Sequence, residues 1–216
     1  MKKRNWTEVY VATGFLIAFV IWTLLVWAVD VQPIGPQASA VGFATLNKYV
    51  HDLTGVHFSL YILTDWLGLV PIGVALGFAA LGLTQWIKRK HLFKVDRSLL
   101  ALGVFYVAVI AVYLLFEFVV INYRPVLIDG CREASYPSST TMLVTSVIPA
   151  AILQWNSRIQ NRVLRYGVAL AASAFVAFMV IGRLFSGVHW VTDIIGGALV
   201  SAGLVTMLHA VGCPTR

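Results

Sequence analysis

Three polar clusters in this chain combine residue types that can bind and attack a phosphoryl group. His189 and Asp193 lie four residues apart, so a helix would place them on one face. A carboxylate in that position can accept a hydrogen bond from one imidazole nitrogen and leave the other as a basic lone pair. Arg183 lies six residues before His189, and Gly187 allows a bend between them. A fixed cation beside an oriented imidazole is the arrangement expected of a nucleophilic histidine that acts on phosphorus.

The other two clusters are typical of anion binding. Arg124 is followed by Pro125, which ends a long apolar segment. Pro137, Ser138 and Ser139 suit the start of a helix. The free N–H groups of a first helical turn and the positive end of the helix dipole attract anions.

Each cluster also has a purely structural interpretation. The His189–Asp193 pair could stabilise a helix end, Arg124 could extend toward lipid headgroups, and Ser138 could be an ordinary helix cap. The combination favours a phosphate site, because two guanidiniums, a helix N-terminus and an oriented histidine are all predicted on one side of the molecule.

The composition indicates that these clusters belong to a membrane protein. Of the 216 residues, 59% are hydrophobic and only 12% are charged. A soluble domain would carry about a quarter charged residues, so the apolar excess must face lipid. The formal charge of +7 does not indicate nucleic-acid binding, because the basic residues form short runs between apolar segments.

The apolar segments predict one all-α domain over residues 1–216, an integral membrane bundle of six helices. The predicted spans run over about 9–29, 66–87, 99–121, 138–155, 166–184 and 190–210. Between the first two, helical spacing predicts a short amphipathic helix at the membrane interface, carrying Phe43, Leu46, Val50 and Leu53. It would end at Thr54-Gly55 and serve as a lid over the bundle or as a gate for substrate.

The basic residues predict the orientation in the cell membrane. Twelve of the 16 lie on one side of the predicted spans, and the other four are Lys48, Arg124, Arg132 and Arg183. Positive-inside asymmetry therefore places both termini in the cytoplasm and the three clusters outside. A cleaved signal peptide is the alternative for the first span, with Ala38-Ser39-Ala40 as its candidate cleavage site.

The order of the clusters resembles a known family signature. The type-2 phosphatidic acid phosphatases, which are related to vanadium haloperoxidases, carry the motifs Lys-x6-Arg-Pro, Pro-Ser-Gly-His and Ser-Arg-x5-His-x3-Asp. The matching positions here are Arg124-Pro125, Pro137-Ser138 and Arg183, His189 and Asp193, over a region from about 117 to 197.

This resemblance implies roles for the matching residues. Arg124 and Arg183 would hold the phosphate oxygens, helped by Ser138, Ser139, Thr140 and backbone N–H groups. His189 would attack phosphorus and form a phosphohistidine that water hydrolyses, and Asp193 would orient the imidazole. Catalysis would then rest on positioning and charge neutralisation, with no metal or other cofactor.

Four positions depart from the family pattern. The first-motif lysine is Glu117, the serine before Arg183 is Gly182, and the second motif carries Ser139 and Thr140 in place of glycine and histidine. Threonine cannot act as a general acid near neutral pH.

The sequence leaves two questions about these departures undecided: which group donates the proton, and what Glu117 does. Glu133, Tyr136 or a water molecule could supply the missing proton. Glu117 would lie two helical turns below Arg124, where it could pair with Arg124 or Arg183, or be protonated.

The sequence therefore favours an integral-membrane lipid phosphatase that acts on a lipid phosphate or polyprenyl diphosphate at the outer leaflet. The alternative is a non-catalytic phospholipid-headgroup binding or transport protein that retains the pocket, which Glu117 and Thr140 favour. A purely structural bundle would leave the three clusters unexplained. The expected partners are the lipid substrate and membrane lipids, and no oligomeric state is indicated.

Overall fold

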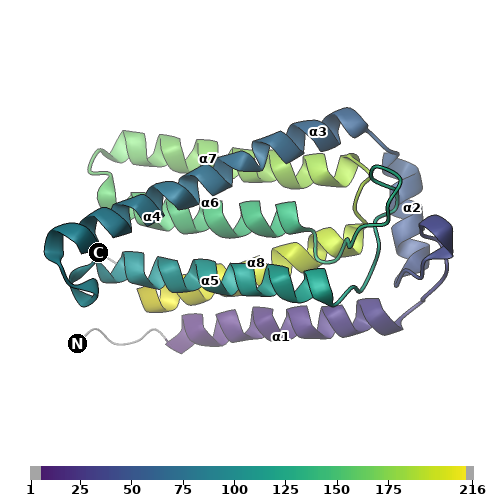
Figure 1. The fold of residues 1–216 in the computed structure, drawn as a ribbon, viewed down its shortest axis with the longest axis horizontal. Coiled ribbons are helices and arrows are strands. Elements are labelled where there is room, and N and C mark those ends of the chain that lie inside the picture. Colours follow the sequence, from purple (N-terminus) through teal and green to yellow (C-terminus); the bar gives the residue numbers. More distant parts are fainter. Residues whose placement is uncertain (1–5, 213–216) are drawn as a thin grey trace.

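Long helices make up most of the structure. The computed structural model describes residues 6–212. In chain order the elements are α1 (Trp6–Ala28), η1 (Pro36–Ala38), α2 (Ala44–Thr54), α3 (Phe58–Leu67), α4 (Leu69–Arg89), η2 (Leu92–Lys94), α5 (Arg97–Phe118), α6 (Ser139–Arg158), α7 (Arg162–Phe185) and α8 (Val191–Gly212). The long helices run along one common axis, and α2 lies at one end of the bundle (Figure 1). The predicted all-α fold class is confirmed.

Five helical segments in the described residues are long and apolar enough to cross a membrane. They are Trp6–Ala28, Phe58–Arg89, Arg97–Phe118, Arg162–Phe185 and Val191–Gly212. Large apolar side chains on their outer faces are exposed, for example Leu76, Val107 and Leu170 at 64%, 67% and 74%. Apolar surface on this scale requires lipid around it. The chain is a multi-pass membrane protein.

The remaining long helix, α6, lies in the middle of the bundle, with contacts to α4, α5, α7 and α8 (Figure 1). It corresponds to the predicted span 138–155. Its buried face includes Thr141, Ser146 and Gln154, because it packs against protein and can pair polar groups there. These buried polar residues make α6 less apolar than the neighbouring helices. A sixth membrane crossing by α6 stays a prediction.

Two helix ends differ from the predicted spans in ways that affect the polar clusters. The second span was predicted from 66, but α3 begins at Phe58 and continues almost directly into α4. The third was predicted to reach 121, but α5 ends at Phe118. Arg124 therefore lies in a loop and not at the end of a helix.

Glycines allow the close contacts around the start of α8. Gly187, between α7 and α8, has a φ of +69°, and a Cβ there would lie 2.2 Å from the carbonyl oxygen of Gly55. A Cβ on Gly196 would lie 2.7 Å from the ring of Tyr136. Only glycine fits both places, so the bend predicted at Gly187 is confirmed.

The helix α2 is attached to α8 through one buried amide. Asn47 is fully buried, and its Nδ2 donates to the Gly42 carbonyl at 2.7 Å and to the Thr192 hydroxyl at 2.9 Å. Leu46 and Leu53, from the predicted apolar stripe, are 41% and 73% exposed. The predicted helix is present and ends at Thr54, and its position at a membrane interface stays a prediction.

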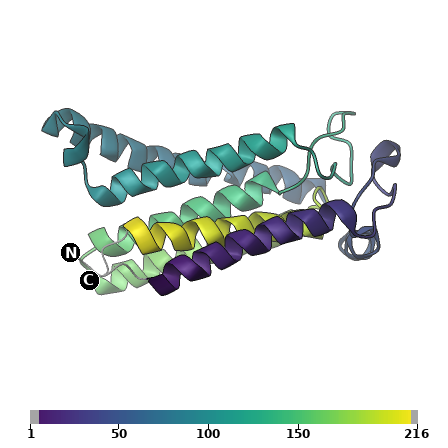
Figure 2. The ribbon, with the colours of Figure 1, turned by 90° about the horizontal axis from the view of Figure 1, so that it is seen from below.

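The two ends of the bundle differ in charge. The first and last described helices begin and end at the same end of the bundle (Figure 2), where Glu8 and His209 lie 3.0 Å apart. Eight of the twelve described Lys and Arg residues lie near this end: Lys88, Arg89, Lys90, Lys94, Arg97, Arg158, Arg162 and Arg165. The other four, among them Arg124 and Arg183, lie toward the opposite end. Lys2, Lys3, Arg4 and Arg216 fall outside the described residues.

Candidate active site

A β-hairpin between α5 and α6 positions one side of the site. Isolated antiparallel bridges join Tyr123 to Ala134 and Ile128 to Cys131. Asp129 and Gly130, with φ of 49° and 78°, form the turn. The hairpin brings residues 122–124 beside residues 133–135, and this pairing fixes Arg124 opposite Glu133.

The hairpin also supplies a serine that links the predicted histidine and aspartate. His189 Nδ1 and Asp193 Oδ2 are 4.0 Å apart, too far for the direct hydrogen bond that the sequence suggested. Ser135 Oγ lies between them, 3.0 Å from Nδ1 and 2.5 Å from Oδ2. Sequence reasoning missed Ser135, because neither motif spacing nor helical periodicity places a loop residue there.

This serine sets the protonation pattern of the imidazole. The hydroxyl has one hydrogen, which it donates to Asp193, so it accepts a hydrogen bond from Nδ1–H of His189. The other nitrogen, Nε2, then carries the lone pair. It is buried and has no hydrogen-bond partner in the described residues.

The carboxylate of Asp193 is held by three donors. Besides Ser135, it accepts from the Asn122 amide at 3.2 Å and from the backbone N–H of Trp190 at 3.0 Å. Asp193 is fully buried. These bonds fix both the carboxylate and the bend that carries His189.

The two predicted arginines both contact one aromatic ring. The guanidinium carbons of Arg183 and Arg124 are 5.1 Å and 5.8 Å from the ring centre of Tyr61 in α3. Arg183 is 1% exposed, and its Nη1 donates to Thr64 Oγ1 at 3.2 Å. Cation–π contact with one ring holds the two like charges near each other.

Each guanidinium also has a carboxylate partner, and neither partner is the one expected. Arg124 Nε lies 3.1 Å from Glu133 Oε2, and Arg183 Nη2 lies 3.7 Å from Asp65 Oδ1. Glu117 is exposed in the last turn of α5 and is in neither of these ion pairs. The expectation that it lies below Arg124 on one helix face was wrong, because the helix ends before Arg124.

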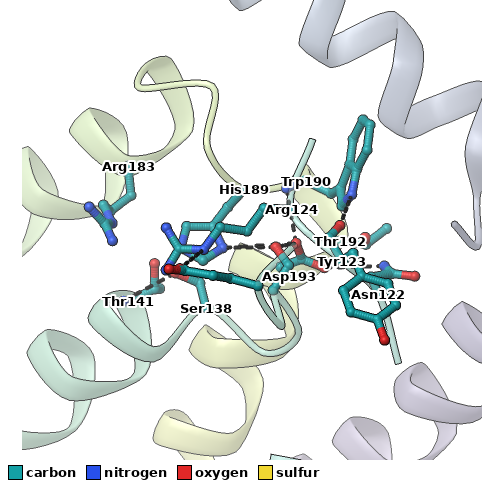
Figure 3. Close-up of polar contacts among 12 residues, drawn as sticks. Asn122, Tyr123, Arg124, Ser138, Thr141, Arg183, His189, Trp190, Thr192 and Asp193 are labelled. Carbon is teal, nitrogen blue, oxygen red and sulfur yellow. Dashed lines mark hydrogen bonds and ion pairs between the residues drawn. The ribbon is translucent and has the colours of Figure 1, made fainter. Parts of the chain in front are cut away.

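The start of α6 completes the site. Ser138 is the N-cap, and its Oγ accepts from the Thr141 N–H at 3.4 Å. The Ser138 N–H donates to the Asp193 carbonyl at 3.0 Å, which joins the second and third motifs. Ser139 and Thr140 line a neighbouring cavity. Thr141, which sequence reasoning did not select, is fully buried, with its side chain toward the site (Figure 3).

Several buried polar atoms around this space form no hydrogen bond within residues 6–212, although one of them, Arg124 Nε, forms the ion pair with Glu133. They are Nε and Nη1 of Arg124, Nε of Arg183, Oγ1 of Thr141 and Nε2 of His189. Figure 3 shows these side chains gathered in one region. An unsatisfied buried donor costs about 1–3 kcal/mol, and more when it is charged. An anion such as a phosphate would satisfy the arginine and threonine donors together.

The surroundings keep His189 neutral. Burial lowers the pKa of His189 well below its ordinary 6.5, and the positive charges of Arg183 and Arg124 lower it further. A neutral imidazole is the nucleophilic form.

Tyr136 lies outside this arrangement. Its ring contacts Phe19 and Phe116, and its hydroxyl bonds to Thr23 Oγ1 at 2.7 Å in the core. Burial raises the pKa of the Tyr136 phenol, which makes it a weaker acid. Tyr136 is therefore not positioned to donate a proton at the site.

The fold and this geometry define a helical membrane protein with a cluster of buried polar atoms that form no hydrogen bond in the described residues, at one end of the bundle. Residues 116–212 match the model of the PAP2 superfamily. This match includes Arg124, His189 and Asp193, and it confirms the resemblance to PAP2-type phosphatases.

The fold also matches that of a solved structure. The crystal structure of the first transmembrane PAP2 type phosphatidylglycerolphosphate phosphatase, from Bacillus subtilis, has a TM-score of 0.57 and 20% sequence identity to this chain. The match covers 92% of this chain and 94% of the other. No match is found among curated proteins.

Proposed function

We propose that this protein is an integral-membrane lipid phosphatase. The observation that carries the proposal is the group of buried atoms of Arg124, Arg183, Thr141 and His189 that form no hydrogen bond in the described residues. Three of these side chains offer donors to a phosphate, and the fourth offers a lone pair to its phosphorus. The match to the PAP2 superfamily and the fold of the Bacillus subtilis phosphatase support the same activity.

The mechanism follows from the positions of these groups. The guanidiniums of Arg124 and Arg183 hold the phosphate oxygens and neutralise their charge. His189 Nε2 attacks phosphorus in line, the P–O bond on the opposite side breaks, and the lipid product leaves as a phosphohistidine forms, while Ser135 and Asp193 hold Nδ1–H. Water then hydrolyses the phosphohistidine and releases phosphate. These side chains supply the positive charge that a metal ion provides in other phosphatases.

An apolar cavity beside the site supports a lipid substrate. It has a volume of about 420 Å³ and lies between α4, α5 and the start of α6. Its apolar wall includes Leu69, Ile72, Val109, Ile110 and Leu143, and Ser139 and Thr140 lie at its polar edge. A lipid phosphate or polyprenyl diphosphate could place its headgroup at the arginines and its chain in this cavity.

The charge distribution supports an outer-leaflet site. Eight described basic residues lie near the end of the bundle opposite the site, as positive-inside asymmetry requires of a cytoplasmic end. Both termini would then be cytoplasmic and His189 extracytoplasmic.

An activity screen with purified protein in detergent tests the proposal. Lipid monophosphates and diphosphates should release inorganic phosphate, and His189→Ala should lower the rate by roughly 10⁴-fold or more. His209→Ala, at the other end of the bundle, is the matched control and should keep full activity. Equal rates in His189→Ala and the parent would remove this histidine from the mechanism.

One observation favours a second candidate, a non-catalytic protein that binds or transports phospholipid headgroups. Thr140 stands where the family motif has its proton-donating histidine. This candidate predicts tight binding of a lipid phosphate with no release of phosphate by either the parent or His189→Ala.

A further inference from the structure

The proposed phosphatase needs a proton donor for the oxygen that leaves phosphorus. An alkoxide is a strong base, so its departure requires a general acid. Thr140 occupies the family position of that acid and cannot serve near neutral pH. A donor other than Thr140 must therefore act at the site.

Besides Asp193, four acidic side chains approach the region, and their positions separate them. Glu117 lines a small pocket with Ser135 and Ser139 but does not line the apolar cavity. The Tyr136 hydroxyl bonds to Thr23 in the core. Glu133 lies on the hairpin beside Arg124 and does not line the apolar cavity. Asp65, in α3, lies beside Arg183 and lines the polar edge of the cavity together with Ser139 and Thr140.

In-line chemistry selects the cavity side. His189 attacks from one side of phosphorus, so the leaving oxygen lies on the opposite side and continues into the lipid. The cavity is where that lipid can lie, and its polar edge therefore surrounds the leaving oxygen. Asp65 is the acidic residue of this edge. Its side chain is 61% exposed and can exchange a proton with water.

We infer that Asp65 is the general acid that protonates the leaving lipid oxygen, an inference that rests on the proposed phosphatase activity. As the bond between His189 Nε2 and phosphorus forms and the P–O(lipid) bond breaks, the carboxyl proton of Asp65 passes to the lipid oxygen. The lipid alcohol leaves, and Asp65 becomes a carboxylate. Asp65 then takes a proton from the water that attacks the phosphohistidine, which returns both side chains to their starting states.

Substrate binding prepares Asp65 for this role. Without substrate, its carboxylate lies 3.7 Å from Arg183 Nη2 and faces a positive charge. A bound phosphate would pair with Arg183 and bring its own negative charge next to Asp65. Both changes release Asp65 from its ion pair with Arg183. Among the described residues, Arg183 from α7 is the charged side chain that pairs with Asp65.

The test compares substrates whose leaving groups differ in basicity. Asp65→Asn should lower kcat/KM for an alkyl lipid phosphate by about 10²–10⁴-fold, because an alkoxide needs the proton. With p-nitrophenyl phosphate, whose leaving group is a weak base, the loss should stay within about threefold. A change in phosphate binding would affect both substrates alike, so the ratio of the two losses isolates the acid. Glu133→Gln, which removes the other carboxylate beside a guanidinium, should not change this ratio.

A second variant strengthens the test. Thr140→His in the Asp65→Asn background restores a family acid at the same cavity edge and should recover alkyl phosphate hydrolysis. Equal losses on both substrates in Asp65→Asn and in Asp65→Glu, or no loss on either, would overturn the role of Asp65. These outcomes differ from failure of the proposed function, in which the parent protein turns over neither substrate.

Discussion

Arginine has different surroundings at the two ends of this bundle. At the end near the termini, Arg89 pairs with Asp96 at 2.9 Å with both side chains over 40% exposed. Arg158 donates to Gln154 and Ser157. At the other end, the side chains of Arg124 and Arg183 are only 11% and 1% exposed, and both have buried N–H groups that form no hydrogen bond in the described residues.

The difference separates structural charge from functional charge. Exposed ion pairs contribute little to stability, about 0–1 kcal/mol, but basic runs of this kind orient a membrane protein. Buried donors without partners are destabilising, so their retention requires a ligand. Under the proposed function, the same residue type therefore sets the orientation at one end and binds phosphate at the other.

The sharpest test of this contrast is the same substitution at both ends. Arg183→Lys should lower kcat/KM by about 10²–10³-fold, because an ammonium cannot reproduce the planar fork that holds phosphate oxygens. Arg89→Lys should change activity by less than about threefold. Phosphate release measured over a range of lipid phosphate concentrations gives both values. Similar losses in the two variants would show that the two ends do not differ in this way.

A smaller effect is expected from the serine between the histidine and aspartate. Ser135→Ala removes the acceptor of Nδ1–H, so His189 loses its fixed tautomer. Loss of a hydrogen bond to a charged network costs about 1.5–3 kcal/mol, or roughly 10–100-fold in kcat. Ser146→Ala, which removes a buried hydroxyl bonded to Ser201 at 2.9 Å along the bundle, is the matched control. Ser146→Ala should lower the thermal stability and leave kcat unchanged. If kcat falls in both variants, the loss in Ser135→Ala reflects lower stability and not the loss of the bond to His189.

The smallest expected effect is a change in pH dependence. Because the pKa of His189 is lowered below 6.5, the nucleophile stays neutral, and the acid limb of kcat/KM should fall below pH 6.5. The folded protein also binds fewer protons there than the unfolded chain, so stability should decrease as the pH falls below about 6.5. Arg124→Gln removes one positive charge and should move the acid limb upward. Both proteins are measured on the same substrate, so ionisation of the substrate affects the two pH profiles equally. If the acid limb of kcat/KM has the same pH midpoint in both proteins, the assignment of this limb to His189 is wrong.

Much of this arrangement was predictable from the motifs. Their order and the alternation of helices placed Arg124, Ser138, Arg183, His189 and Asp193 at one end of a bundle, and the structure brings them together there. Their catalytic roles stay predictions. The polarity of α6 follows from its position in the centre of the bundle. Composition alone does not predict that position.

Other parts of the site depend on tertiary contacts that the sequence does not encode locally. Tyr61 and Asp65 were assigned to a connection, because the apolar signal of the second span starts only after them, and their pairing with Arg183 needs α3 beside α7. Ser135 depends on the hairpin pairing. The Asp129-Gly130 dipeptide is a known hairpin signal and could have indicated that pairing.

The buried amide of Asn47 connects the surface helix to the catalytic region by a short route. It bonds Thr192, the residue next to Asp193 in sequence, and Thr192 also accepts from the Trp22 indole at 3.1 Å. Three separate segments therefore meet at the first turn of α8. In the proposed mechanism, a tilt of α2, such as one caused by a change in the surrounding lipids, would therefore reach Asp193, the carboxylate assigned to orient the nucleophile.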